Sequence, residues 1–156
     1  MSLKEVVVAL WALASDKRFR LFIPQLFWTG VSISFFSGNL VEIMSHTIEG
    51  DDQTKFKNSM LAMVFFGVGE ILGCFFIGTI VDRFGSRAAS FMNILIMMAM
   101  TAVTFTFCLL WEFSWLAYLM CFLWGFQDSA INTHSGEILG FEFDSNSEPY
   151  AVYNIL

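Results

Sequence analysis

Charged and basic residues are scarce in this chain of 156 residues. Only 14% are Asp, Glu, Lys or Arg, against about a quarter in soluble domains. The chain has eight Lys and Arg against fourteen Asp and Glu, for a formal net charge of −6. This balance excludes the basic surface that binding of nucleic acid requires.

The chain has three cysteines, which follow no ligand pattern. Cys74, Cys108 and Cys121 lie in apolar runs, with no CxxC and no cluster of His and Cys. We therefore expect packing residues and no metal site, no cofactor and no disulfide framework. The sequence also has no nucleophile–base constellation and no phosphate loop, so we do not expect an enzyme.

Apolar residues are abundant. They make up 56% of the chain, with nineteen Phe, nine Met and five Trp, and the mean hydropathy is +0.65. A chain this apolar cannot cover a soluble globule with polar side chains, and it is not a disordered tail. It indicates an integral, multi-pass membrane protein whose surface contacts the lipid bilayer.

Long apolar runs predict the spans. A bilayer core of about 30 Å needs about 20 apolar helical residues, and the runs at about 21–44, 60–81, 88–110 and 113–135 are long enough. The expected fold is an all-α membrane protein with a four-helix transmembrane segment over 21–135.

The N-terminal residues allow two interpretations. The apolar run 6–14 ends in Ala12-Leu13-Ala14, as a signal peptide does, but the residues before it carry no net positive charge. We prefer an amphipathic interfacial helix over 1–20, anchored by Trp11.

The Lys and Arg residues predict the orientation. Residues 1–20 hold four of them, and the loops 45–59 and 82–87 hold two each. Placing the N-terminus and the loop 82–87 in the cytoplasm puts six inside and two outside. The acidic segment 136–156 would then be a cytoplasmic loop followed by the start of a further helix, with Ser147 as N-cap and Pro149 in the first turn.

Acidic side chains in or near the predicted spans are the candidate coupling or binding residues. A charge at the centre of a span costs about 2.5–3.5 kcal/mol, so an acid there has a functional or a packing reason. Glu70 and Asp128 are the main candidates, with Asn132 one turn after Asp128 and Glu42 nearer the interface. They either form hydrogen bonds between helices or line a path for a solute, ion or proton.

Small residues at helical spacing predict close helix packing. Gly30, Ser34 and Gly38 recur every four residues before Glu42, and Gly69 and Gly73 form a GxxxG. A second stripe joins Glu70 to neighbouring small residues, namely Gly67, Cys74 and Gly78. We therefore expect Glu70 to point into a protein contact or a cavity.

The turn between the second and third spans carries a motif. Gly78, Asp82, Arg83, Gly85 and Arg87 resemble the G-x-x-x-D-R-x-G-x-R loop of the major facilitator superfamily. The resemblance implies a gating role for Asp82, with Arg83 and Arg87 as its basic partners.

Three further stretches narrow the resemblance. Residues 34–38, 67–73 and 125–133 are similar in order and spacing to the second half of the uncoordinated-ninety-three-like family, a branch of that superfamily. The resemblance implies that 1–20 connect two six-helix halves and that the four spans begin the second half.

Two functions follow from this resemblance. The first is a truncated or partial transporter, with movement of a small solute or ion as its ancestral role. The second is a non-transporting regulator or trafficking partner of an ion channel or another membrane protein, in which the Gly and Ser stripes of the first two spans face the partner. Four helices cannot form a two-sided cavity, so both functions require other transmembrane helices.

Overall fold

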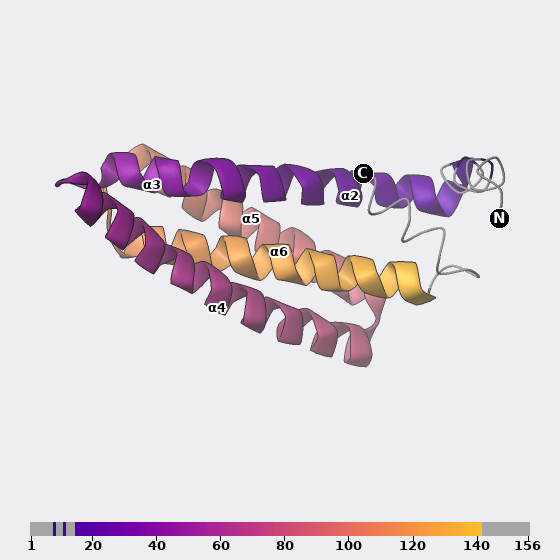
Figure 1. Ribbon diagram of the computed structural model, residues 1–156. Helices are drawn as coiled ribbons and strands as arrows, with labels where there is room; N and C mark the ends of the chain where they lie inside the picture. The colour runs from indigo at the N-terminus through magenta and orange to yellow at the C-terminus, as the bar shows by residue number, and fades with distance from the viewer. Residues whose placement is uncertain (1–7, 9–10, 12–14, 142–156) are drawn as a thin grey trace.

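The computed structural model describes residues 8, 11 and 15–141 of the chain. From residue 17 on, these residues form long helices joined by short turns, and no strand occurs among them. Figure 1 shows α6 running along the bundle between α2 and α4, with α5 beside it. The arrangement is an all-helical bundle in which α6 contacts α2, α4 and α5.

The first long helix contains a local irregularity. It consists of α2 (Lys17–Phe35), a π-helical turn η1 (Phe36–Leu40) and α3 (Val41–Thr47), which follow one another without a break. A π turn inserts one extra residue into a helix. At the start of this turn the consecutive rings of Phe35 and Phe36 reach different helices: Phe35 stacks on Trp124 of α6 at 4.7 Å, and Phe36 contacts Phe66 of α4 at 4.6 Å.

Helix α4 (Asp52–Phe84) begins at a side-chain cap. Asp51 accepts a hydrogen bond from the backbone N–H of Thr54 at 3.2 Å, which satisfies one of the free donors of the first turn. Hydrogen bonding from Thr54 also lowers the pKa of Asp51. The helix ends at Gly85, whose φ of 80° is a conformation that glycine adopts without strain.

The remaining helices are α5 (Ser86–Leu110) and α6 (Trp115–Phe141). Residue Trp111, in the left-handed conformation with φ 48°, ends α5. The indole N–H of Trp124 donates to Thr104 Oγ1 at 2.9 Å and ties α6 to α5. Core residues from the other helices pack against α6, among them Leu40, Met44, Phe66, Met100 and Phe107.

Glycines bring α4 and α6 into backbone contact. A Cβ atom added at Gly69 or Gly73 would overlap backbone atoms of Phe122 and Phe126 on α6, and one added at Gly125 would overlap the backbone of Phe66 on α4. Three positions on two helices therefore admit no side chain, which is the physical use of small residues between membrane helices.

The helices extend beyond the predicted spans because hydropathy marks the part that fits the bilayer, while hydrogen bonding sets the helix ends. Residues 17–20, predicted as part of a connector, already belong to α2, and α4 starts well before residue 60. Residues 136–141, predicted as loop, continue α6. The rest of the predicted 1–20 connector lies almost wholly outside the described residues, as do 142–156 with the predicted cap at Ser147 and Pro149.

Three helical segments are long and apolar enough to cross a membrane: Phe19–Thr47, Asp52–Phe84 and Ser86–Leu110. They match the first three predicted spans. The fourth predicted span corresponds to α6, which has the length but carries Gln127, Asp128, Asn132 and His134 in its second half. These polar side chains lower its hydropathy, so its crossing of the membrane stays a prediction.

Candidate functional site

Four of the eight buried polar side chains among the described residues lie on α6. Gln127, Asp128, His134 and Ser135 are all at most 7% exposed, although the helices around them are strongly apolar. A buried polar group is costly unless it is hydrogen-bonded. The partners of these four side chains therefore define what the site can do.

Asp128 is only partly satisfied. Its Oδ2 accepts a hydrogen bond from Asn132 Nδ2 at 3.2 Å, one turn along the same helix. Its Oδ1 is buried and has no hydrogen-bond partner among the described residues. Glu70 of α4 is close enough to interact with it electrostatically. The structure thus brings together the two acids that the sequence analysis selected, with one carboxyl oxygen left open.

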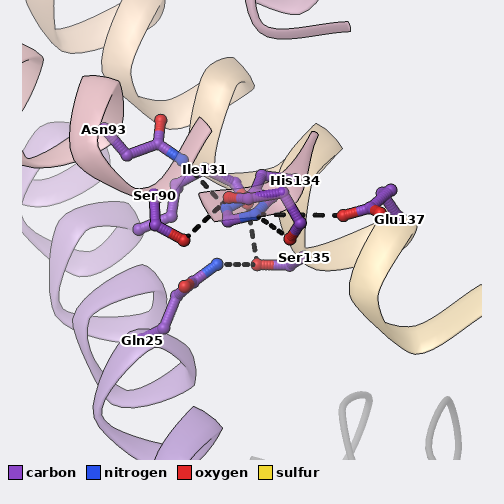
Figure 2. A network of polar contacts seen from close by, with 8 residues as sticks. Gln25, Ser90, Asn93, Ile131, His134, Ser135 and Glu137 are labelled. Atoms are coloured by element: carbon purple, nitrogen blue, oxygen red, sulfur yellow. Dashed lines mark hydrogen bonds and ion pairs between the residues drawn. The ribbon is translucent and has the colours of Figure 1, made fainter. Parts of the chain in front are cut away.

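His134 joins α6 to the start of α5. Asn93 Nδ2 donates to His134 Nδ1 at 3.2 Å, and Ser86 Oγ lies 2.9 Å from His134 Nε2. With Nδ1 accepting from Asn93, the ring proton of neutral His134 is on Nε2 and is donated to Ser86. Glu137 Oε2 is 3.8 Å from the same nitrogen. Figure 2 shows Asn93 and Glu137 pointing toward the imidazole of His134.

Two further hydrogen bonds tie α2 to this face of α6. Gln25 Nε2 donates to Ser135 Oγ at 2.9 Å (Figure 2), and Ser32 Oγ donates to Gln127 Oε1 at 3.3 Å. The polar face of α6 is consequently cross-linked to α2 and α5 by side chains from well-separated parts of the sequence.

The turn at residues 82–87, for which the sequence analysis predicts a gating role, is exposed. Asp82, Arg83 and Arg87 face solvent, and none of them forms an ion pair with another described residue. The position of Gly78 has open space where a side chain would stand. Ser86, which the motif does not single out, makes the contact between this turn and α6.

The other predicted residues fall into two groups. Gly69 and Gly73 contact α6 of the same chain, so the expectation that the second-span stripe faces a partner is wrong for them. Gly30 and Gly38 have nothing within 4 Å of an added Cβ, and Ser34 is exposed. Glu42 is exposed as well and lies 3.9 Å from His46.

The close contact between α4 and α6 does not follow the predicted stripe of small residues around Glu70. Gly67 and Gly78 have open space beside them, and the tight contact follows Gly69 and Gly73 one position away. A single helix shows which residues share a face, but the rotation of the helix against its neighbour depends on the whole interface. Glu70 is half-buried at the edge of this contact.

Sequence reasoning missed Gln25, Asn93 and Ser86. Each is one polar residue in or beside an apolar run, and in a membrane helix that is the signal that could have marked them. Their partners lie more than forty residues away in the sequence, so no spacing rule pairs them.

The helices define an integral membrane protein of the helical-bundle class, with a buried polar face on α6. No protein-family model, curated protein or solved structure matches the chain.

Proposed function

We propose that this chain is part of a major facilitator-type carrier of the uncoordinated-ninety-three-like branch and that Asp128 with Glu70 couples solute movement to a proton or cation. The observation that carries the proposal is the open Oδ1 atom of Asp128, buried among apolar helices beside a second acid. A carboxyl in that position is costly to keep unless it exchanges a proton or binds a cation.

In this proposal α6 is the fourth span. Its polar residues face α2, α4 and α5 while lipid contacts the apolar outer faces of those helices, which supports a membrane helix shielded by its neighbours. The N-terminus and the turn at residues 82–87 lie in the cytoplasm, as the distribution of Lys and Arg favours. Asp82, Arg83 and Arg87 are then free to contact helices that complete the carrier.

Uptake measurements test this role. Because four helices cannot form the carrier alone, the chain is expressed as part of a complete twelve-helix version, and uptake of a panel of labelled small solutes is measured at acidic and neutral external pH. Wild type takes up at least one solute with a pH-dependent rate, and Asp128→Asn and Glu70→Gln lose the pH dependence. Glu42→Gln is the matched control, because Glu42 is exposed and pairs only with the neighbouring turn. An identical pH profile in all four proteins contradicts the coupling role.

A second function, regulation or trafficking of another membrane protein, is supported by the open face of α2. A cleft of about 500 Å³ lies along it, lined by Phe27, Gly30, Val31, Ser34, Phe35 and Asn39. Gly30→Leu fills this cleft without a clash inside the chain, so it should abolish co-purification of a partner while the chain stays folded. Gly67→Leu, also beside open space, is the control. Unchanged co-purification with Gly30→Leu contradicts this function.

A further inference from the structure

Two hydrogen bonds join the start of α5 to α6, and both end on the imidazole of His134. Asn93 Nδ2 donates to His134 Nδ1 at 3.2 Å (Figure 2), and the hydroxyl of Ser86 lies 2.9 Å from His134 Nε2. Ser86 is the first residue of α5, directly after the turn at residues 82–87. One side chain therefore holds this turn and the first two turns of α5 against α6.

These contacts require a neutral ring. His134 is fully buried, and its Nδ1 atom accepts a hydrogen bond, so this nitrogen carries no proton. A protonated imidazole has N–H donors at both nitrogens. Its Nδ1–H would meet the Nδ2 donor of Asn93, and the added charge would lie out of reach of water. Protonation therefore breaks the contact between His134 and Asn93.

Rotation of the Asn93 amide does not repair this contact. Asn93 Oδ1 is buried and has no hydrogen-bond partner among the described residues. A half-turn of the amide would bring Oδ1 to the ring and place the NH₂ group in that unpaired position. Two buried N–H donors would then lack an acceptor, which costs more than one hydrogen bond returns. Opening of the contact is thus favoured over rearrangement within it.

Glu137 is the charged group that acts on His134. Its Oε2 atom lies 3.8 Å from His134 Nε2 without a hydrogen-bond partner among the described residues, and 21% of the Glu137 side chain is exposed. Its carboxylate is a counter-charge for a protonated ring and partly offsets the cost of burial. The other described charged side chains of α2, α4 and α5 at this end of the bundle are exposed and form no ion pair with the ring, namely Lys17, Arg20, Asp82, Arg83 and Arg87.

We propose that His134 is a pH-sensitive switch: the neutral ring holds the turn at residues 82–87 and the start of α5 against α6, and protonation beside Glu137 releases them. Histidine is the side chain whose charge changes between about pH 5 and pH 8 when its surroundings allow it. The switch uses other residues than Asp128 and Glu70, so it does not depend on transport, and its tests measure structure instead of uptake.

Hydrogen exchange of the full chain in detergent, followed by mass spectrometry from about pH 8 to about pH 5, tests the switch. After correction for intrinsic exchange rates, the amides of residues 86–93 should lose about tenfold of their protection in acid, as expected when two hydrogen bonds are lost. His134→Gln keeps a donor and an acceptor but does not titrate, so its protection should not depend on pH.

His46→Gln is the matched control for this experiment, because His46 is exposed, and it should behave like the unmutated chain. Constant protection of residues 86–93 in the unmutated chain would overturn the proposal. The same loss of protection in His134→Gln as in the unmutated chain would overturn it as well.

Nitrogen NMR of the histidine-labelled chain gives a second readout that needs no variant to fold. The two histidines of the chain, His46 and His134, are distinguished by their exposure to a soluble paramagnetic reagent. At about pH 8, His134 should be the Nε2–H tautomer, and its ring should gain a proton over the pH range in which residues 86–93 lose protection. An Nδ1–H tautomer, or protonation of the ring without loss of protection, contradicts the switch.

Glu137→Gln tests the role of the counter-charge. Without the carboxylate the protonated ring is less favourable, so the proton uptake of His134 and the release of residues 86–93 should both need a lower pH. Transitions at the same pH as in the unmutated chain contradict the part that the proposal gives to Glu137.

Discussion

Gly125 of α6 lies directly against the backbone of Phe66 on α4, so closely that a Cβ atom at Gly125 would overlap the Phe66 carbonyl. Gly69 and Gly73 of α4 make the reciprocal contact with Phe122 and Phe126. The two helices therefore meet backbone to backbone, and this contact sets how far the polar face of α6 is from α4.

Gly125→Ala should lower the free energy of unfolding by about 1–3 kcal/mol or more, because a methyl group forces two backbones apart. The measurement is denaturant or thermal unfolding in a mild detergent. Gly136→Ala, on the same helix, adds a Cβ atom that meets open space, and it should be neutral or stabilising by up to about 1 kcal/mol through helix propensity. Equal stability of the two variants would rule out the close contact.

His134→Ala should destabilise the bundle by about 2 kcal/mol, because Asn93 and Ser86 then lose a partner. His46→Ala is the control, since His46 is exposed and its pair with Glu42 is weak. Its effect should stay within about 0.5 kcal/mol. The same unfolding experiment checks both, and a His134 variant as stable as the His46 variant contradicts the network.

The thiols should differ in reactivity. Cys108 is exposed, whereas Cys121 is buried with its Sγ 3.4 Å from Met44 Sδ. In detergent, a membrane-soluble maleimide should modify Cys108 more than about tenfold faster than Cys121, which reacts only after opening of the bundle. Mass spectrometry of the labelled peptides measures the two rates. Similar rates would mean that Cys121 is not in the core.

Deleting one residue should have a different effect inside the π turn Phe36–Leu40 than in the regular part of the same helix. Removing Gly38 from the turn Phe36–Leu40 converts it to α-helix and leaves Leu40 and Met44 facing the core, so the chain should fold. Removing Gly30 instead rotates all later residues of the helix by about 100° and should prevent folding. Size-exclusion chromatography in detergent compares them, and equal behaviour of the two deletions would contradict the assigned turn.

Apolar runs predict helices well in this chain because the three helices long enough to cross a membrane are apolar over most of their length. The same runs say little about rotation around each helix axis. The contact of Gly125 with Phe66 and the approach of Glu70 to Asp128 depend on that rotation. The sequence therefore identified Glu70 and Asp128 as candidates but could not predict that they lie near each other.

The polar cross-links were harder to foresee. Asn93 and Gln25 are single polar residues in apolar surroundings, and each finds its partner on another helix. Gly30 and Gly38 were expected to pack closely and instead have open space beside them. A small residue permits close approach, but whether a neighbour fills the space depends on which helix is there.

Sidedness of labelling tests most directly whether α4, α5 and α6 cross the bilayer in turn. In a chain whose native cysteines are replaced, Glu49→Cys, Arg87→Cys, Glu112→Cys and Phe141→Cys put single thiols at exposed helix ends. A membrane-impermeant maleimide is then applied to sealed, oriented vesicles. We expect Glu49→Cys and Glu112→Cys to react from one side, and Arg87→Cys and Phe141→Cys from the other. Labelling of all four from the same side, or release of the chain from the vesicles by carbonate, would contradict the account.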